Sequence, residues 1–510
     1  MHIGDWVAKR ARLYPSHLFV KEDGRELDNA AFNARVNQTA HALSALGVAK
    51  GGRVVVLMAN TSAFLEVFFA CAKIGALIVP VNTHLATEEL MHIIGDASAR
   101  VLISSADMRA KIAFIEGELD DDIHFLTQGA EASDGTRSLE NFTQEHPSSE
   151  PGSEENADLA DPLMIMYTSG TTGRPKGAVL THGNFLFGAI HSLLNYQLDR
   201  SCKSLVVAPL FHIGALAASV TPVIYAGGSL VLKSFDNPSD IISCIMEEKI
   251  SFMFAVPVMY DMMAKAPRWP SADFSSIRFF IAGGAPMPVP LIRRYQEEKG
   301  VHFAQGYGMT ETLRVTALDL ADASRKVGSI GKEVFHTSLK IMDDAGREVP
   351  PGDTGEIVVQ GPTVFKGYWN NPQATETVLR DGWFHTGDLG RRDGEGFIYV
   401  AGRKSDLIIC AGENIYAPEV EHAIEAHPHV AEAGVVGVQD AKRGEVAAAF
   451  VRLEEGRLLK EDDLLRFLED KIAAFKHPRK IRFVTEALPR NRLGKLIKDE
   501  LKAMAAGRKE

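Results

Sequence analysis

Residues 53–82 read RVVVLMANTSAFLEVFFACAKIGALIVPVN. The run 53–60 is apolar and rich in valine, which is typical of a buried strand, and 77–82 is a second run of the same kind. Between them, residues 62–76 place apolar side chains at i, i+3 and i+4, the pattern of a helix with a buried face. A strand, a helix and a strand in this order form a unit whose two strands are parallel. The stretch therefore predicts an α/β domain with a mainly parallel sheet.

The same alternation continues along the chain, with further runs of strand length at 100–105, 160–169, 229–233, 251–257 and 277–284. Residues 205–232 carry no formal charge and are long enough to span a bilayer, but prolines and a pair of glycines divide them. We therefore predict two buried strands that flank a buried helix there. The polar, acidic segment 129–161 is predicted to be an exposed loop, and residues 3–10 a short amphipathic helix.

The pattern changes towards the C-terminus. Residues from about 330 to 402 form short runs separated by DDAG and PGDTG turns, which predicts a β-rich subdomain, and the last hundred residues predict an α+β module. Residues 471–510 contain twelve Lys or Arg against four Asp or Glu, whereas the rest of the chain has a net charge of −19. This asymmetry suggests an anionic ligand between the two parts, although a solvated basic tail is the alternative.

Length and composition limit the function classes. A length of 510 residues predicts two to four domains at roughly 150 residues each, and 45% hydrophobic with 24% charged residues is typical of a globular protein. The net charge of −11 argues against a nucleic-acid binder. The four cysteines are far apart in the sequence, which excludes a CxxC motif and fits a reducing cytoplasm. The N-terminus lacks the apolar segment of a signal peptide, so we expect a cytoplasmic protein without a membrane span.

The segment Tyr167–Gly177 reads YTSGTTGRPKG and follows an apolar run. Its glycines allow backbone N–H groups to point inward, its hydroxyls add donors, and Lys176 adds a cation. These are the properties of a phosphate-binding loop, although a surface turn rich in Gly and Thr is the alternative. The segment is not a Walker A motif, because glycine follows Lys176 where that motif has Ser or Thr. The candidate phosphate ligands are Thr168, Ser169, Gly170, Thr171, Thr172, Gly173 and Lys176.

Five further motifs follow this loop: GGAP at 283–286, QGYGMTE at 305–311, WFHTGD at 383–388, GRKSD at 402–406 and PRNRLGK at 489–495. Together with the loop, and in the same order, they resemble the motifs of the adenylate-forming superfamily of AMP-binding enzymes. The similarity is to its acyl- and aryl-CoA synthetase branch, which includes fatty-acid–CoA and 4-coumarate–CoA ligases, and it covers nearly the whole chain. It implies an α/β fold with a large N-terminal domain, 1–402, that has parallel α/β sheets plus a small β-barrel-like subdomain. A small, mobile α+β C-terminal lid domain, 407–510, is expected to follow.

The resemblance implies a reaction in which a carboxylate attacks the α-phosphate of ATP and releases pyrophosphate. Two anions meet in this step, so cations are required. In this chain Glu311 resembles the Mg²⁺ ligand, Thr310 a donor to the α-phosphate, and Lys495 the lysine that bridges the carboxylate and the nucleotide. Taken alone, Lys495 would be one more lysine in a basic tail.

The resemblance also assigns nucleotide contacts. Tyr307 is expected to stack on adenine, and Asp388, assisted by Arg403, to bind the ribose hydroxyls. Core packing for Tyr307 and a turn role for Asp388 are the alternatives. The other expected nucleotide contacts are Gly283, Gly284, Ala285, Gly306 and Gly308.

Residues 403–406 are expected to be a hinge, with Ser405 at the position where backbone rotation swings the lid domain. One orientation would bring Lys495 to the nucleotide for adenylation. The other would admit the thiol of coenzyme A and place residues 409–414 at the site. Cys410, within that segment, is expected to be a buried or loop thiol rather than a nucleophile.

The segment PLFHIG at 209–214 resembles the PxFH segment of acyl- and aryl-CoA synthetases. His212 stands where amino-acid-adenylating domains have an Asp, which argues against an α-amino acid as substrate; a core histidine is the alternative. Gly214 replaces the bulky aromatic residue of hydroxycinnamate ligases and should leave a larger pocket. Arg314 replaces a proline and could meet a distal anionic group of the acid, or else pair with Asp319. The expected acid contacts are His212, Gly214, Gly283, Gly308, Leu313 and Arg314, and the expected coenzyme A contacts are Arg443, Lys476 and His477.

We therefore expect an ATP-dependent acid–CoA ligase that uses Mg²⁺ and passes a carboxylic acid through an acyl-adenylate to the thiol of coenzyme A. The acid is expected to be medium or long aliphatic, alicyclic or aryl. An enzyme that loads a carrier protein, and a nucleotide-binding protein without turnover, are the alternatives. The expected partners are small molecules and not nucleic acid, and a homodimer remains open.

Overall fold

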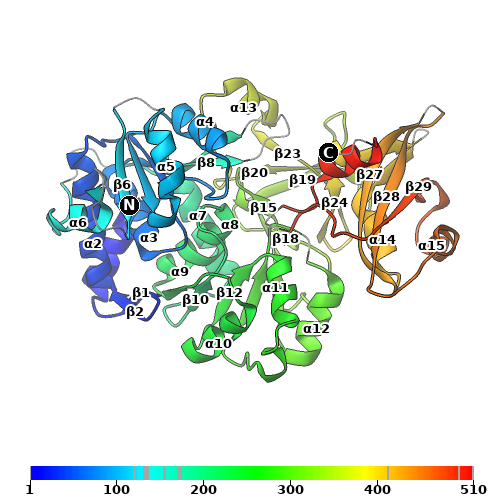
Figure 1. Ribbon diagram of the computed structural model, residues 1–510, viewed down its shortest axis with the longest axis horizontal. Helices are drawn as coiled ribbons and strands as arrows, with labels where there is room; N and C mark the ends of the chain where they lie inside the picture. Colours follow the sequence, from blue (N-terminus) through cyan, green and yellow to red (C-terminus); the bar gives the residue numbers. More distant parts are fainter. Residues whose placement is uncertain are drawn as a thin grey trace. The chain divides into compact units, whose positions relative to one another are not determined.

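The computed structural model describes residues 2–118, 122–129, 137–152, 157–168, 175–285, 287–410, 413–440, 442–491 and 494–507. The chain divides into two compact units, and Figure 1 shows its course through both. The first comprises Met1–Ser338 and Val359–Phe384, and the second Leu339–Val358 and His385–Glu510. The second unit includes residues on both sides of the predicted hinge at 403–406, whose motion stays a prediction.

The stretch 53–82 forms the predicted βαβ unit, which comprises β3 (Arg53–Leu57), α3 (Ser62–Ile74) and β4 (Leu77–Pro80). The two strands are parallel neighbours. Helix α3 begins where the hydroxyl of Thr61 accepts a hydrogen bond from the N–H of Phe64 at 3.3 Å, and it ends at Gly75, whose φ is 69°. A glycine suits this end because a left-handed φ strains other residues.

This unit lies in the eight-stranded sheet of the first unit, whose strand order is β21-β9-β8-β4-β3-β5-β6-β7. The strands from β8 to β7 pair in parallel, whereas β8–β9 and β9–β21 are antiparallel. The mainly parallel sheet is thus confirmed, with an antiparallel edge. The strands not yet given are β5 (Val101–Ser105), β6 (His124–Gln128), β7 (Arg137–Ser138), β8 (Pro162–Thr168), β9 (Lys176–Thr181) and β21 (Gly367–Tyr368).

A second sheet of the first unit has seven strands in the order β14-β13-β12-β10-β11-β1-β2, parallel except for β1–β2. Its core contains the buried aromatic side chains of Tyr260, Phe280, Tyr295 and Phe303. The strands are β1 (Leu18–Glu22), β2 (Arg25–Asp28), β10 (Lys203–Val206), β11 (Ser229–Leu232), β12 (Phe252–Ala255), β13 (Phe279–Ala282) and β14 (Phe303–Gln305).

The uncharged stretch 205–232 folds as predicted. Strands β10 and β11 are adjacent and parallel, and α8 (Ile213–Ala215), a π-helical turn (Leu216–Val220) and α9 (Thr221–Ala226) connect them. Across the described ranges, no helix has both the length and the apolar character needed to cross a bilayer.

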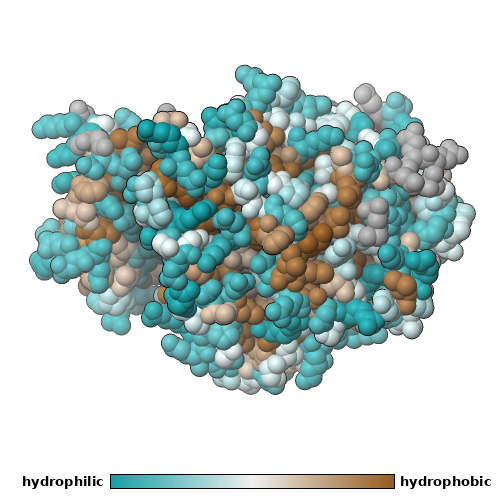
Figure 2. Space-filling view, turned by 180° about the vertical axis from the view of Figure 1, so that it is seen from behind, coloured by the Kyte–Doolittle hydropathy of each residue, from teal (hydrophilic) through white to brown (hydrophobic). Residues whose placement is uncertain are grey.

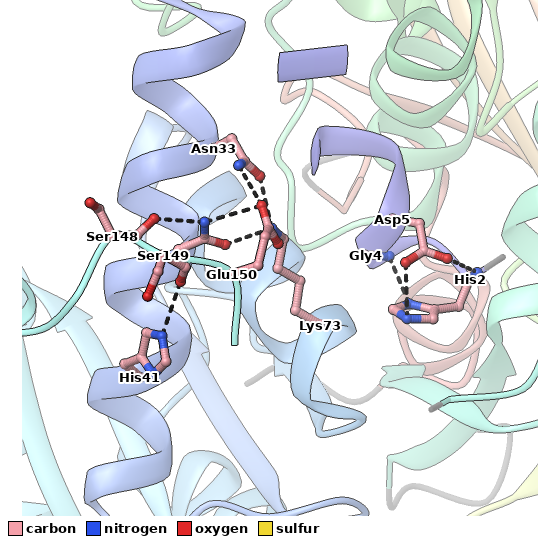
Figure 3. Close-up of polar contacts among 10 residues, drawn as sticks. His2, Gly4, Asp5, Asn33, His41, Lys73, Ser148, Ser149 and Glu150 are labelled. Atoms are coloured by element: carbon pink, nitrogen blue, oxygen red, sulfur yellow. Dashed lines mark hydrogen bonds and ion pairs between the residues drawn. The ribbon is translucent and has the colours of Figure 1, made fainter. Parts of the chain in front are cut away.

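The prediction of an exposed loop at 129–161 is wrong in part, because this segment contains β7 and a helix and is tied to α3. The carboxylate of Glu150 accepts hydrogen bonds from Lys73 Nζ at 2.5 Å and from Asn33 Nδ2 at 2.7 Å (Figure 3). The side chain of Lys73 is only 4% exposed, so its charge needs this partner. Acidic composition did not reveal that one carboxylate neutralises a lysine buried on a distant helix.

The predicted α+β module lies in the second unit. Its sheet has the order β26-β25-β28-β27, with β29 beside β28. Val435 and Val436, neighbours in β27, belong to different buried clusters, because successive strand residues face opposite sides of a sheet. The elements are β25 (Leu407–Cys410), β26 (Glu413–Tyr416), α14 (Ala417–Glu425), β27 (Val430–Asp440), β28 (Gly444–Leu453), α15 (Glu461–Leu468), β29 (Lys480–Val484) and α16 (Lys498–Ala505).

The predicted β-rich segment 330–402 forms most of another five-stranded sheet, with the order β19-β20-β23-β22 and β24 beside β23. These strands are β19 (Ser338–Met342), β20 (Thr354–Gln360), β22 (Leu379–Arg380), β23 (Trp383–Arg392) and β24 (Ile398–Arg403).

The remaining α-helices lie in the first unit: α1 (Gly4–Leu13), α2 (Asn29–Ala45), α4 (Thr87–Ala97), α5 (Arg109–Glu116), α6 (Leu139–Gln144), α7 (His182–Tyr196), α10 (Pro238–Glu248), α11 (Pro257–Ala264), α12 (Val289–Lys299) and α13 (Pro372–Val378). Helix α1 confirms the predicted N-terminal amphipathic helix, with Trp6, Val7 and Arg10 on its buried face. The molecular face in Figure 2 is mostly hydrophilic, with hydrophobic areas near its middle, as is usual for a folded protein.

Candidate functional site

The predicted phosphate loop connects β8 to β9. Its residues Ser169, Gly170, Thr171, Thr172 and Gly173 lie outside the described residues. On either side, Thr168 and Lys176 are opposite each other in the antiparallel ladder, and the Thr168 hydroxyl donates to the Lys176 carbonyl at 3.5 Å. Helix α7 begins directly after β9, where the hydroxyl of Thr181 accepts from the N–H of Asn184 at 3.2 Å. The pairing of β9 with β8 and the capped start of α7 therefore hold the chain that follows the loop in place.

A tight hairpin carries Thr310 and Glu311 between β15 (Gly308–Met309) and β16 (Leu313–Arg314). A Cβ atom on Gly308 would lie 1.6 Å from the carbonyl oxygen of Leu313, so only glycine permits this approach. Leu313 itself has a φ of 52°, a left-handed conformation that is strained for a leucine. The hairpin thus holds the predicted catalytic pair in a backbone conformation that the surrounding fold imposes.

The carboxylate of Glu311 is held by a tyrosine from another segment. Glu311 is 6% exposed, and its Oε1 accepts a hydrogen bond from the hydroxyl of Tyr368 at 2.8 Å. The ammonium of Lys176 lies over the ring of the same tyrosine, 5.7 Å from its centroid. Tyr368 therefore connects the lysine at the end of the predicted phosphate loop to the predicted Mg²⁺ ligand.

Tyr368 carries no signal in the sequence that marks it as a site residue. Its segment, KGYWNNP, has the turn residues of a surface connection and no charge pattern of its own. Its position follows from the pairing of β21 with β9, in which Tyr368 lies opposite Ala178. No local signal in the sequence specifies that pairing.

The predicted nucleotide segments meet at one sheet edge. Strands β12, β13 and β14 are parallel neighbours, so their carboxyl ends lie together. Gly283, Gly284 and Ala285 follow β13, and Gly306 and Tyr307 follow β14. The backbone of Tyr307 is fixed, because its N–H donates to the Thr316 hydroxyl at 3.0 Å and its carbonyl accepts from Val315 at 2.9 Å.

Phe254 lies between two of the predicted acid contacts. A Cβ atom on Gly214 would be 2.7 Å from its Cζ, and a Cβ atom on Gly283 would be 2.7 Å from its Cε2. The expectation that Gly214 leaves a larger pocket therefore needs correction, because the ring of Phe254 takes the space next to this glycine. The apolar pattern of residues 251–257 predicts only a core strand. A fully buried strand does not reveal which of its side chains faces a site.

His212 lies directly before α8, and its N–H donates to the carbonyl of Pro209 at 3.0 Å. Burial, with a smaller contribution from the charge of His84, lowers the pKa of His212 to about 4. The imidazole is therefore neutral at pH 7. It can exchange hydrogen bonds with an acid but adds no positive charge to the site.

The side chain of Arg314 extends to α7. Its Nη2 donates to the hydroxyl of Ser192 at 2.7 Å, and its guanidinium lies 4.3 Å from the ring centroid of Tyr196. Among the described residues, Arg314 has no ion pair with Asp319 or another carboxylate. Its Nε is buried without a hydrogen-bond partner. A contact between Arg314 and the acid stays a prediction.

In the second unit, Asp388 and Arg403 face each other across β23 and β24. Arg403 Nε donates to Asp388 Oδ1 at 2.8 Å, and the N–H of Asp388 donates to the hydroxyl of Thr386 at 3.0 Å. Asp388 is 6% exposed. The pair thus presents a fixed carboxylate and a guanidinium side by side, as ribose binding would require.

Lys495 lies close enough to this pair to respond to its charges. Desolvation of the ammonium group lowers the pKa of Lys495, the positive charge of Arg403 lowers it further, and the negative charge of Asp388 opposes both. Three predicted site residues that are far apart in the sequence, Asp388, Arg403 and Lys495, therefore interact through their charges.

The predicted coenzyme A contacts differ in their surroundings. Lys476 Nζ donates to both carboxylate oxygens of Glu419, at 2.6 and 2.8 Å, so its charge is neutralised within the protein. His477 Nε2 lies 3.1 Å from the carbonyl oxygen of Ile472, and Arg443 is exposed. Lys476 thus offers a phosphate less charge than the sequence suggested.

The predicted hinge residue Ser405 lies in a single 3₁₀ turn, Lys404–Asp406. Its hydroxyl is 3.4 Å from a carboxylate oxygen of Asp406, and Lys404 pairs with Asp344 at 2.8 Å. Cys410 is buried, as expected for a thiol without a chemical role.

The chain matches two family models: AMP-binding enzyme over residues 7–369, and AMP-binding enzyme C-terminal domain over residues 419–495. It is 40% identical to a feruloyl-CoA synthase from Amycolatopsis sp, covering 98% of each chain. It is 39% identical to an indoleacetate–CoA ligase from Aromatoleum aromaticum, covering 99% of this chain and 98% of that one. The crystal structure of ATP-bound MatB from Rhodopseudomonas palustris is similar with a TM-score of 0.90, at 31% identity and 99% coverage of both chains.

Proposed function

Because the chain belongs to the AMP-binding enzyme family, we propose that it is an ATP-dependent acid–CoA ligase that forms an acyl-adenylate and then an acyl-CoA. In the first step a carboxylate oxygen attacks the α-phosphorus of ATP, a P–O bond breaks, and pyrophosphate leaves. In the second, the sulfur of coenzyme A attacks the acyl carbonyl, loses its proton, and AMP leaves with the C–O bonding electrons.

The first step needs positive charge where two anions meet. We assign Lys495 to the attacking carboxylate and the nucleotide, and Lys176 with Thr310 to the phosphates. Glu311 would hold Mg²⁺, which compensates phosphate charge when bound. Within the described residues no group of three or more His, Cys, Asp and Glu could hold a metal. A single carboxylate such as Glu311 fits Mg²⁺, which usually combines one or two carboxylates with phosphate oxygens and water.

The observation that carries this proposal is the contact of Tyr368 with both Glu311 and Lys176. This contact supports the proposal because Glu311, proposed to hold Mg²⁺, and Lys176, proposed to bind phosphate, both touch one side chain although they come from segments far apart in the sequence. A carboxylate beside a lysine of this kind is what a Mg²⁺–triphosphate would require.

The test is product formation with purified protein, Mg²⁺, ATP and a panel of acids. An acid–CoA ligase releases pyrophosphate with an acid and AMP on addition of free coenzyme A. A carrier-loading enzyme would need a holo-carrier protein for the second step, and a nucleotide-binding protein would release neither product. Lys495→Ala should lower pyrophosphate release by roughly 10²- to 10³-fold; undiminished release would refute its assigned role.

For the acid, we infer an aryl or arylalkanoic substrate in preference to a long aliphatic one. The support is Phe254, whose ring packs on Gly214 and Gly283 and offers a flat aromatic wall beside the predicted acid contacts. The names of the feruloyl-CoA synthase and the indoleacetate–CoA ligase describe acids with aromatic rings. Higher kcat/KM for long-chain fatty acids than for every aryl acid in the panel would refute this assignment.

A further inference from the structure

A buried glutamate lies beneath the segment that carries Lys495. Glu432, in β27, is 8% exposed. Its Oε1 accepts hydrogen bonds from Arg452 Nε at 2.5 Å and from the N–H of Leu488 at 3.1 Å, and its Oε2 accepts from Arg490 Nε at 3.3 Å. Both of its oxygens are therefore engaged, one of them by the segment that leads to Lys495.

Arg490 binds both Glu432 and the backbone next to Lys495. While its Nε faces Glu432, its Nη1 donates to the carbonyl of Gly494, the residue before Lys495, at 2.8 Å. A guanidinium can bind both groups because its donors have a fixed planar geometry. Arg490 thus links a buried carboxylate to the backbone immediately before the predicted catalytic lysine.

The chain around Lys495 forms a hairpin whose described arms, residues 489–491 and 494–497, are joined by hydrogen bonds. The N–H of Ile497 donates to the carbonyl of Pro489 at 2.9 Å, and the N–H of Lys495 donates to Asn491 Oδ1 at 3.0 Å. The hairpin also lies against β27, because a Cβ atom on Gly434 would be 3.5 Å from Leu496 Cδ1. Among the described residues, the Glu432–Arg490 ion pair ties the hairpin to this sheet, and Lys498, directly after the hairpin, pairs with Glu421.

We propose that Glu432 positions Lys495 for adenylation by holding Arg490 and, through it, the hairpin 489–497. Glu432 is a positioning residue, because its carboxylate reaches the lysine only through Arg490 and the hairpin backbone. This inference rests on the proposed role of Lys495 in the first step. Since the second step has no assigned role for Lys495, loosening the hairpin should slow adenylation and spare thioester formation.

The test compares Glu432→Gln and Arg490→Gln with the matched control Arg452→Gln, which removes the other guanidinium partner of Glu432 and leaves Arg490 in place. Pyrophosphate release and the conversion of added acyl-adenylate and coenzyme A to acyl-CoA are measured separately. We expect Glu432→Gln and Arg490→Gln to slow the first reaction by roughly 10- to 100-fold, since small misplacements of a catalytic group cost rates of this order. The second reaction should stay within about twofold of wild type, and Arg452→Gln should change neither reaction.

Amide hydrogen exchange gives a readout that needs no turnover. The N–H groups of Gly494, Lys495 and Ile497 are each hydrogen-bonded within the hairpin. In Glu432→Gln they should exchange at least about tenfold faster than in wild type, and in Arg452→Gln at the wild-type rate. Unchanged exchange in Glu432→Gln would overturn the proposal even if the enzyme's acid were unknown.

Three kinetic outcomes separate the possibilities. Wild-type adenylation by Glu432→Gln, or a parallel fall of both reactions, would overturn the positioning role. A Lys495→Ala, Glu432→Gln double variant that adenylates no more slowly than Lys495→Ala would support it, because both residues would then act through one group. Normal adenylation by Lys495→Ala would instead overturn the proposed function of the lysine, and hydrogen exchange would still decide whether Glu432 holds the hairpin.

Discussion

At the scale of single residues, the site depends on side chains that touch two functional groups at once. Tyr368 contacts Glu311 with its hydroxyl and Lys176 with its ring, and Phe254 packs on two glycines of the predicted acid site. Neither residue is charged, and neither would take part in the chemistry. Tyr368 would hold the proposed metal ligand and the proposed phosphate-binding lysine, and Phe254 would form a wall of the acid site, so each can be tested by a change at one of its two contacts.

Tyr368→Phe removes the hydroxyl from Glu311 and keeps the ring beneath Lys176. A hydrogen bond to a charged group contributes about 1.5–3 kcal/mol, so pyrophosphate release should fall roughly tenfold or more. Because the carboxylate would be less well oriented, half-maximal rate should require more Mg²⁺. A Mg²⁺ titration measures this, with Tyr225→Phe as the control, a half-buried tyrosine that packs on Trp6 instead. An unchanged Mg²⁺ requirement would contradict the assigned role of Glu311.

Gly214→Ala should lower kcat/KM for aryl acids, because the new methyl group would lie 2.7 Å from Phe254 Cζ and displace the ring. Overpacking of this kind costs about 1–3 kcal/mol, which corresponds to roughly 5- to 150-fold. Adding Phe254→Leu removes the clash and should restore part of the activity in the same assay. A single variant as active as wild type would show that the ring does not form this wall.

If the guanidinium of Arg314 only braces the Glu311 hairpin, and makes no contact with the acid, Arg314→Ala should reduce the rates with monocarboxylic and dicarboxylic acids by the same factor. The reason is that Ser192 and Tyr196 already engage the guanidinium, so that it braces the Glu311 hairpin against α7. Parallel measurements of kcat/KM on matched acid pairs decide the point. A loss confined to dicarboxylic acids would instead assign Arg314 to a distal anionic group of the substrate.

At the scale of elements, α2 and α3 are joined by a segment that looks like a loop in the sequence. Lys73 of α3 donates to Asn33 and Asn37 of α2, at 2.8 and 2.6 Å, as well as to Glu150. The side chain of Lys73 is 4% exposed, whereas that of Glu150 is 51% exposed. The two partners therefore depend on each other unequally.

This inequality predicts different effects on stability. Glu150→Gln leaves a buried ammonium without a counter-charge and should lower the free energy of unfolding by about 3 kcal/mol. Lys73→Met leaves only the half-exposed carboxylate of Glu150 without its partner, so it should lower the free energy of unfolding clearly less than Glu150→Gln does. Urea unfolding of both variants measures the difference, and neither change should alter the rate of pyrophosphate release. Equal losses of stability would show that Glu150 is not the required counter-charge.

At the scale of the whole molecule, stability should depend on histidines buried in the first unit. Burial lowers the pKa of His182 to about 3, with the charge of His2 adding to the effect. Burial, together with the charges of Arg314 and His336, lowers the pKa of His191 to about 4. Both rings are fully buried, so the neutral form is the one that the fold accommodates.

A folded-state pKa below the unfolded value of 6.5 means that the unfolded chain takes up protons first. The free energy of unfolding is therefore highest above pH 6.5, where the histidines are neutral in both states, and it decreases as the pH falls towards 4. At pH 5, which is about 1.5 units below the unfolded pKa, each histidine should lower the free energy of unfolding by at most about 2 kcal/mol, because each pH unit contributes about 1.4 kcal/mol. Urea unfolding at pH 7, 6 and 5 tests this, and His182→Asn should show a weaker dependence. The same slope in that variant would assign the acid sensitivity to other groups.

The sequence by itself determined the alternation of strands and helices, the α+β module at the C-terminus and the order of the motifs, because periodicity and turn residues act over short distances. Its ordered motifs also resemble those of the adenylate-forming superfamily, and that resemblance marked Glu311, Asp388, Arg403 and Lys495 as candidates, because each stands at a position of those motifs. Only the tertiary structure decided which uncharged or distant groups hold these residues in place. Tyr368, Phe254 and Glu432 act through strand pairing and packing between segments far apart in the chain, and such contacts leave no local signal in the sequence.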